Sequence, residues 1–565
     1  MTEMNRRWAL AICAGFLLAG LDAAGQASAV QAPPTAAQVP ALQAPVTPAP
    51  PATEQEFART IPYEERITQQ GRVQRMTARE AVELALRNNL DLAIERYNEQ
   101  LARQRVRAAL GYYDPSMSLS TARSSTDIPG TGASGGTSIP IEQVDVTSFS
   151  PGVKQNLPGG ASAAVSLLST RTYTSSTTPT LNPVVNSSLG ASITQPLMRG
   201  FLATAGDRSI DLARIDTEIA ASLYRQRLTS IVQQVLTQYW ELAYAVSVYE
   251  TRRQSKDLAL VQFEGAKLRV QSGLLSPVAL TAARAEIASR ERDILQAEVS
   301  IIGAENALKL LLSQDPASPL WETAVLPVDR PKPDTGDLTL EHAIELATAR
   351  RPELEQLRLQ MAQNAIDRRF YTREKLPTVN LTAGLTSAGK SGTALVKLND
   401  VRTADPTNPS FGSYQRSWAQ VFGFDFPAWA IGLSVQVPIG NRSAGAVLQQ
   451  AELVRSRLDT QKIKTLQAVM VDVRYAVQVI GTQRKSLEAA RLTTQLFAEQ
   501  LEAQTARYSA GFSNDFELRR YQRDLVDARV KELRALVDLQ LAGIALQRAT
   551  DTLIEATGVA VPKQP

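Results

Sequence analysis

Long stretches of the chain carry apolar residues spaced alternately three and four positions apart. One series lies in the first half and recurs in the second: Leu228, Val232, Val235, Tyr239, Leu242, Val246 and Tyr249, then Leu466, Met470, Val473, Val477 and Ile480. A third stretch has an apolar residue every seven positions, at Leu280, Ile287, Ile294, Ile301 and Leu308. Sustained heptads indicate helices that pack against other helices along a seam.

These helices should be very long. No proline occurs between Gly206 and Ser272, or between Ser443 and Ser509. A helix of ~65 residues is a rod of roughly 100 Å, because each residue adds about 1.5 Å. Such a rod is longer than an ordinary globular domain is wide.

Each predicted rod ends at a turn, and the two turns resemble each other. In the first, Gly273 suits the C′ position, and Ser276 and Pro277 suit the N-cap and first turn of a returning helix. In the second, Gly511 takes the glycine position, and Asn514 and Glu517 have the spacing of a cap and its N3 partner. Each half therefore predicts two antiparallel helices joined at a tip.

A period-two pattern precedes each rod. Apolar side chains alternate with small or polar ones at Met117, Leu119 and Thr121, and again at Val379, Leu381, Ala383 and Leu385. Shorter alternating runs follow at Leu189–Pro196 and Leu433–Pro438. Alternation fits the lipid-facing wall of a membrane barrel and equally fits a half-buried soluble sheet. The pattern alone leaves both open.

The number of strands also stays open. Symmetry between the halves gives four strands per chain. Residues 149–173 contain Pro158-Gly159-Gly160, a hairpin turn between two further strand-like runs, which would raise the number to six. Residues 124–140 and 387–417 are rich in Gly, Ser, Thr and Pro, so we expect long loops there.

The chain is internally duplicated. Thr77 and Glu80 form a capping box that opens a helical stretch to about Tyr113, and Thr339 opens its counterpart, which runs to about Lys375 with a break near Pro352. Ala81-x-Glu83-Leu84-Ala85 returns as Ala343-x-Glu345-Leu346-Ala347. Duplication predicts the same structural unit twice. We place the first repeat at 71–312, a linker at 313–337, the second repeat at 338–557 and a tail at 558–565.

The N-terminus predicts export. Arg6-Arg7, the apolar run Trp8–Leu21 and Ala27-Ser28-Ala29 are typical of a signal peptide over residues 1–29. Residues 30–70 are proline-rich and predict a flexible extension. The single cysteine, Cys13, lies in the signal, which excludes thiol chemistry from the mature chain. No later stretch has ~18 consecutive apolar residues, so we expect no transmembrane helix.

The composition of the chain argues against nucleic-acid binding and against catalysis. The 565 residues carry a net charge of +4 without a basic cluster, which gives no support for nucleic acid as a partner. His342 is the only histidine, and we find neither a glycine-rich phosphate loop nor a convergent Ser/His/Asp set. We therefore expect no catalysis, metal site or cofactor.

Several short motifs occur in a fixed order: Glu80-Ala81-x-x-Leu84-Ala85 with its repeat, Thr194-Gln195-Pro196-Leu197 after a strand, and the tips Arg269-x-x-x-Gly273-Leu274-x-Ser276 and Arg507-Tyr508-x-x-Gly511-x-Ser513. Occurring twice over, on heptad helices and behind an export signal, they resemble the TolC-like outer-membrane efflux protein family. The resemblance covers about Met76 to Gly558.

The resemblance implies a mainly α fold with membrane β. Three identical chains would form a twelve-stranded β-barrel in outer-membrane lipid, four strands from each, continued by a periplasmic coiled-coil tube of twelve helices. Such a homotrimer is a passive exit duct for efflux or secretion, coupled to an inner-membrane transporter through a periplasmic adaptor (a membrane fusion protein). The alternative is a soluble periplasmic coiled-coil adaptor or scaffold, although adaptors usually have one hairpin rather than two duplicated ones.

The resemblance also assigns roles to residues at the tips. The turns would dock the adaptor through Gly273, Leu274, Ser276, Gly511 and Ser513. The periplasmic gate would involve Tyr508, Asp515, Glu517 and Arg520. Arg520 stands where the family often has a second acid, so we expect a Glu517–Arg520 ion pair in this chain.

Overall fold

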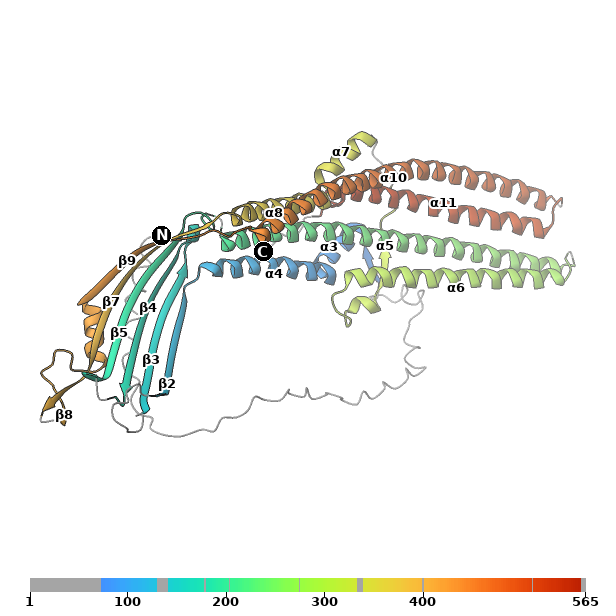
Figure 1. Ribbon diagram of the computed structural model, residues 1–565. Helices are drawn as coiled ribbons and strands as arrows, with labels where there is room; N and C mark the ends of the chain where they lie inside the picture. The colour runs from blue at the N-terminus through green and yellow to red at the C-terminus, as the bar shows by residue number, and fades with distance from the viewer. Residues whose placement is uncertain are drawn as a thin grey trace. The chain divides into compact units, whose positions relative to one another are not determined.

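The computed structural model describes residues 73–129, 141–176, 179–202, 204–273, 275–332, 339–398, 401–510 and 512–559. These residues form one antiparallel sheet, a set of long helices and shorter elements (Figure 1). The expected signal peptide, the proline-rich extension and most of the C-terminal tail lie outside the described residues, as do Leu274 and Gly511.

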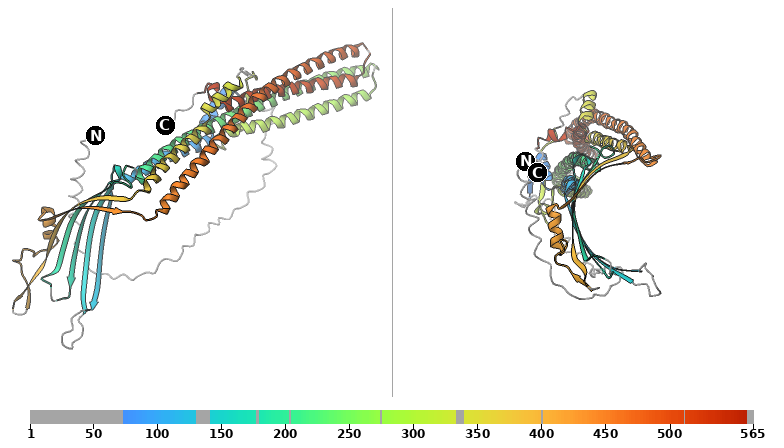
Figure 2. Two further views of the ribbon diagram at one scale, coloured as in Figure 1. Left: turned by 45° about the horizontal axis from the view of Figure 1, so that its top comes forward. Right: turned by 60° about the vertical axis from the view of Figure 1, so that its left-hand side comes forward.

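Six long strands make the sheet. In spatial order they are β2 (Ser116–Pro129), β3 (Ile141–Asn156), β4 (Ser162–Thr174), β5 (Leu181–Pro196), β7 (Thr378–Leu398) and β9 (Phe426–Gln436). The short strand β8 (Val401–Ala404) pairs with the end of β7. The two halves of the chain meet where β5 pairs with β7, and Figure 2 shows the sheet curled.

The six strands correct the four per chain that the family resemblance implied. The first half contributes four strands and the second half two, because the β3–β4 hairpin has no counterpart. Its turn is the 3₁₀ segment Pro158–Gly160, where Gly159 and Gly160 have φ of 86° and 94°. These left-handed angles explain the two glycines.

The expected loops at 124–140 and 387–417 are partly wrong. Strand β2 continues to Pro129 and β7 continues to Leu398, and a helix, α9 (Tyr414–Gly423), follows β8. In these distal parts Ser, Thr and Gly replace the apolar side chains. Backbone pairing between the strands continues there, but the alternation of apolar and polar residues that predicts a strand is absent.

The sheet has one apolar face, which we call the outer face. Register brings Val379 opposite Val435, Leu381 opposite Leu433 and Leu385 opposite Trp429. The other strands add Met117, Leu119, Val153, Val165, Leu189, Ala191 and Ile193 to it. The inner face carries small and polar residues, among them Ser116, Ser118, Ser192, Thr194, Thr382 and Ser434.

Two long antiparallel helix pairs confirm the heptad predictions. Helix α5 (Ala205–Gln271, 67 residues) returns through α6 (Val278–Leu312), and α10 (Arg442–Ser509, 68 residues) returns through α11 (Asp515–Ala549). The predicted seam residues of α5 from Leu228 to Tyr249 are all buried, and Ile301 and Leu308 of α6 lie in the same core.

Shorter helices pack beside them. They are α3 (Ala78–Asn88) and α4 (Leu90–Leu110) in the first repeat, and α7 (Leu340–Arg350) and α8 (Pro352–Glu374) in the second. The break before Pro352 was predicted, whereas the break at Asn89 was not. Asn89 has an extended ψ of 125° and its side chain accepts from the Leu92 amide, so it caps α4.

The remaining elements are small. Strands β1 (Val73–Met76) and β6 (Ala324–Pro327) pair in parallel, so part of the segment between the repeats belongs to a sheet. The 3₁₀ segments Gly111–Tyr113 and Pro319–Glu322 and helix α12 (Leu553–Thr557) complete the described chain. None of its described helices is both long enough and apolar enough to cross a membrane.

Candidate functional site

The first tip turn joins α5 to α6. Gly273 follows the helix end with φ of 76°, and its amide donates to the Val270 carbonyl at 3.0 Å. The Ser276 hydroxyl accepts from the Val278 amide at 3.4 Å at the start of α6. The predicted glycine C′ position is confirmed. The expected serine N-cap is wrong by one position, because the N-cap of α6 is Pro277 and no side chain caps this helix.

The second tip turn joins α10 to α11. The Phe512 amide donates to the Arg507 carbonyl at 2.9 Å, and the Asn514 side chain accepts from the Glu517 amide at 2.9 Å. The predicted cap is therefore present. Gln504, buried on α10, donates to the Ser513 hydroxyl. Phe512 and Phe516 are 85% and 65% exposed, so this tip presents apolar surface to its surroundings.

One direct contact joins the ends of the two long helices. Arg269 Nη1 on α5 donates to Tyr508 Oη on α10 at 2.8 Å, and the guanidinium carbon lies 5.3 Å from the centre of the tyrosine ring. The contact combines a hydrogen bond with a cation–π interaction. The family resemblance predicted Tyr508 but not its partner, although Arg269 is the repeat counterpart of Arg507 in the tip motif.

The charges of the second tip pair differently from the expectation. Within the described residues Glu517 and Arg520 form no ion pair with each other. Asp515 instead pairs with Arg519 at 2.7 Å, one helical turn away, and the Arg519 side chain is mostly buried. The Asn514 cap starts the helix so that Asp515 and Arg519 share a face at (i, i+4). Arg519 is therefore a tip residue that the sequence reading missed.

Comparisons with known proteins identify the family to which the chain belongs. The model of the family described as "Outer membrane efflux protein" matches residues 81–314 and 343–552. The chain belongs to this family. The protein is thus an outer-membrane efflux duct. Of the two interpretations that alternation left open, this favours the wall of a membrane barrel, in which the apolar face is the one toward lipid.

Individual relatives are distant. The efflux protein is 25% identical to the cobalt-zinc-cadmium resistance protein CzcC of Cupriavidus metallidurans over 353 residues, which are 61% of this chain and 73% of CzcC. Its fold resembles that of CusC, with 16% identity, a TM-score of 0.58, and coverage of 84% of this chain and 92% of that chain. The Campylobacter jejuni CmeC channel gives the same identity, TM-score and coverage of this chain, with 86% of its own chain covered.

Ion pairs join the two repeats of the efflux protein along the hairpins. Arg252 of α5 contacts Asp527 of α11 at 3.2 Å, Arg523 of α11 contacts Glu286 of α6 at 3.7 Å, and Arg534 of α11 contacts Glu241 of α5 at 2.8 Å. Together with Arg269–Tyr508, these contacts fasten one hairpin to the other.

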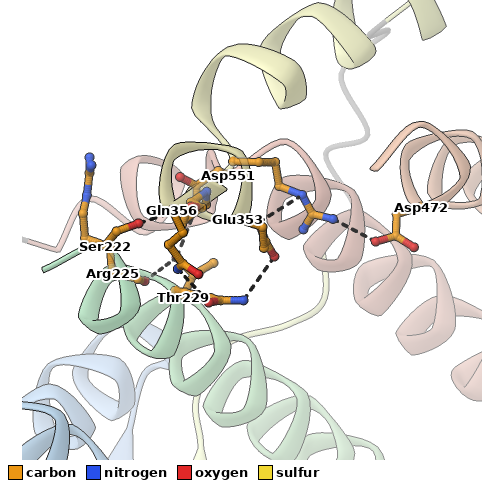
Figure 3. Close-up of polar contacts among 10 residues, drawn as sticks. Ser222, Arg225, Thr229, Glu353, Gln356, Asp472 and Asp551 are labelled. Carbon is orange, nitrogen blue, oxygen red and sulfur yellow. Dashed lines mark hydrogen bonds and ion pairs between the residues drawn. The ribbon is translucent and has the colours of Figure 1, made fainter. Parts of the chain in front are cut away.

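A polar cluster fastens the repeats again where α8 begins (Figure 3). Arg351, only 8% exposed, places Nη2 2.8 Å from Asp472 of α10. Ser222 of α5 donates to the Pro352 carbonyl at 3.2 Å, and Thr229 donates to Asp551 at 3.2 Å. Burial raises the pKa of the Asp551 carboxyl. Apart from the kink at Pro352, no pattern along the chain predicts this cluster, because its members come from four separate segments.

No group of three or more His, Cys, Asp or Glu side chains in the described ranges is arranged to hold a metal. His342 lies in the first turn of α7, exposed, with Nδ1 3.6 Å from Glu345.

Proposed function

We propose that this efflux protein is a passive trimeric duct whose periplasmic tips open when an adaptor grips them, while an inner-membrane transporter supplies the energy. The observation that carries the proposal is the sheet. It has an apolar face toward lipid and two edges, β2 and β9, that pair on one side only within the described chain. Unpaired strand edges are untenable in lipid, so copies of the chain must close the wall.

Closure by three copies gives a wider barrel than the family resemblance implied. Six long strands from each of three chains make eighteen strands rather than twelve, with β2 of one copy beside β9 of the next. Barrel diameter grows with strand number, and barrels of 16–18 strands leave an aqueous channel. The small polar side chains of the inner face would line it.

The helices offer further support for association. Apolar side chains lie exposed on α4 and α10 of the single chain, among them Leu90, Ile94, Tyr97 and Leu101, and Leu453, Ile463, Val471 and Tyr475. Those of α4 recur at three- and four-residue spacing, which suits a helical seam with another chain. Three copies would bring twelve long helices together.

The tips would dock the adaptor. Gly273 and Ser276 of the first tip and Ser513 of the second shape the two turns, and Leu274 and Gly511 complete the set from the sequence. Exposed Phe512, Phe516 and Val278 lie beside them. Polar turns with isolated apolar side chains suit a contact that must form and release, in contrast to the continuous seams between permanently packed helices.

The gate would lie at the same end. The Arg269–Tyr508 contact and the Arg252–Asp527 pair hold the two hairpins of a chain together, so opening requires their release. Asp515, Glu517 and Arg520 lie in the first two turns of α11, next to the second tip. Packed helices that switch between two arrangements are a known means of gating.

Ion conductance across a planar bilayer tests the proposal. Arg269→Ala removes the hydrogen bond and the cation–π contact, so we expect a several-fold higher conductance than for the unchanged protein. Lys267→Ala is the matched control, because Lys267 contacts Glu264 of its own helix at 3.3 Å. If all forms fail to conduct and the purified protein is a water-soluble monomer, the proposal is wrong.

A further inference from the structure

Helix α9 lies on the outer face of the sheet, toward lipid, and not on the inner face. Ser387, Gly389 and Ser391 belong to the same face of β7 as Leu381 and Leu385, and all three are buried beneath the helix. In Figure 1 this helix is the orange one beside β7. The approach is close, since a Cβ at Gly389 would come within 2.1 Å of the Ser417 carbonyl oxygen.

Hydrogen bonds fix the direction of α9 along β7. The Ser391 hydroxyl donates to the Ser413 carbonyl at 2.8 Å, and the Ser387 hydroxyl donates to the Val421 carbonyl at 2.7 Å. Between them the Ser417 hydroxyl donates to the Gly389 carbonyl at 3.0 Å. The C-terminal end of α9 is therefore level with Ser387, next to the apolar band, and its N-terminal end lies farther from it.

The apolar band ends where α9 begins to cover the sheet. On β9 and just beyond, the outward series Trp429, Ile431, Leu433, Val435 and Val437 spans roughly 26 Å along the strand at ~3.3 Å per residue. That length is comparable with the ~25 Å apolar band of outer-membrane barrels. Serines replace the apolar residues above it, so α9 lies at the level where lipid gives way to head groups.

Trp418 packs α9 against the sheet. Its ring lies between Phe149 and Tyr414, with centroids 6.5 Å and 6.1 Å away, and its Nε1 donates to Ser169 at 3.3 Å. Ser169 in turn shares a 2.7 Å hydrogen bond with Ser187. The polar groups that α9 covers are thus paired with the helix or with one another.

The exposed side of α9 is graded from polar to apolar. Gln415 and Arg416 are exposed near its N-terminal end. At the other end Phe422 and the C-cap residue Phe424 are exposed, 60% for Phe422. Phe424 has φ of 53°, a conformation that phenylalanine rarely adopts, in the turn that leads from α9 into β9.

Arginines of neighbouring strands lie level with the polar end. Arg123 and Arg171 both pair with Thr147 on the outer face, and the same row continues through Val185 to Ser391. Asp145 and Asp127 follow farther from the apolar band. Aromatic side chains at the edge of an apolar band, followed by arginines, match the order of acyl chains and phosphates in a leaflet.

We propose that α9 is an interfacial helix that binds the outer leaflet of the outer membrane. Phe422 and Phe424 enter the boundary of the acyl chains, while Arg416, Arg123 and Arg171 meet lipid phosphates. The inference rests on the proposed function, because it takes the sheet as the lipid-facing wall of a closed barrel.

Fluorescence quenching in vesicles tests the inference. A polarity-sensitive dye is attached to single cysteines in the full-length Cys13→Ser protein, reconstituted in phosphatidylcholine with brominated acyl chains. Ile431→Cys and Ala428→Cys report the two faces of β9. We expect strong quenching at Ile431→Cys and at Phe422→Cys, and little at Ala428→Cys or Gln415→Cys. A head-group spin label should quench the dye at Gln415→Cys.

The outcomes separate the two claims. If the dye at Ile431→Cys is quenched and the dye at Phe422→Cys is not, the wall is in lipid and the interfacial helix is refuted. If neither dye is quenched, the proposed duct itself fails, and the inference with it. Phosphatidylglycerol tests the arginines: it should increase head-group quenching at Gln415→Cys, and the triple variant R123Q/R171Q/R416Q should lose that increase. The same increase in the triple variant would refute the phosphate contact.

Discussion

Asp551, which lies outside the membrane sheet, should make the folding stability of the protein depend on pH. Its carboxyl lies among Thr229, Arg225, Arg351 and Glu353, and burial raises its pKa above the ordinary 3.8. The folded chain therefore binds this proton more tightly than the unfolded chain does. The charged carboxylate opposes folding above the folded-state pKa, and this cost disappears as the pH falls below the unfolded value.

Asp551→Asn should therefore stabilise the protein at about pH 7, with a gain that shrinks as the pH falls toward about 4.5. Asparagine also tolerates the positive φ of 54° at this position and can still accept from Thr229. The midpoint of helix loss on heating, followed by circular dichroism at both pH values, measures the gain. Asp257→Asn, at an exposed position of α5, is the control. An equal gain at both pH values would show that charge burial is not the cause.

Gly389 is a position where space, not backbone conformation, requires glycine. Gly389→Val should displace α9 from the sheet, because the added side chain would collide with the backbone at Ser417. The displaced helix should then be cleaved by trypsin after Arg416. Gly384→Ala is the matched control on the same strand, since its Cβ would meet only the Ala191 carbonyl at 3.8 Å. Equal cleavage after Arg416 in both variants would contradict the close seating of α9.

At the scale of elements, the contacts between repeats decide how the hairpins move. Arg252 faces both Asp527 of the other repeat, at 3.2 Å, and Asp293 of its own hairpin, at 3.8 Å. Only the first of these pairs must break if one hairpin moves away from the other. Replacing each aspartate in turn therefore removes the same kind of ion pair, once between the repeats and once within a hairpin.

Asp527→Asn should raise the conductance of the duct, and it should raise it further in combination with Arg269→Ala. Asp293→Asn should leave conductance close to that of the unchanged protein, because the α5–α6 hairpin moves as a unit. Single-channel recording under identical salt compares the variants. Equal effects of the two substitutions would indicate general loosening of the helices, not release between repeats.

The elements also show what the sequence could predict. The long helices were predictable because heptads, proline-free runs and glycine turns are local signals. The second tip turn has the expected Asn514 cap, whereas the first has its glycine but not the expected serine cap. The break at Asn89 was not predictable from proline, since asparagine ends α3 by capping the next helix. Helix α9 was missed because only Trp418, Val421 and Ser417 of its residues carry the packing face, within a stretch rich in turn formers.

The candidate site was predictable only in part. Tyr508 came from the resemblance to the family, and the tip turns came from motifs that recur in the two repeats. Their partners, Arg269 for Tyr508 and Arg519 for Asp515, depend on how helices pack and where α11 begins. The polar cluster around Arg351 joins residues more than a hundred positions apart, and no pattern along the chain brings them together.

At the scale of the whole molecule, the duct requires neighbouring copies of the chain to close the open sheet into a barrel. One chain supplies six long strands and four long helices in a duplicated but unequal pair of repeats. The additional β3–β4 hairpin enlarges the membrane wall without adding to the helices. A trimer would then have eighteen strands continued by twelve long helices.

Disulfide cross-linking between β2 and β9 tests this closure most directly. Ser116→Cys, Ser118→Cys and Ser120→Cys are each combined with Ser434→Cys in the Cys13→Ser protein, all on the inner face. We expect at least one pair to give a covalent ring of three chains in isolated outer membranes, while each single cysteine gives none. Products of another copy number, or monomers for every pair, would contradict the closed trimeric barrel.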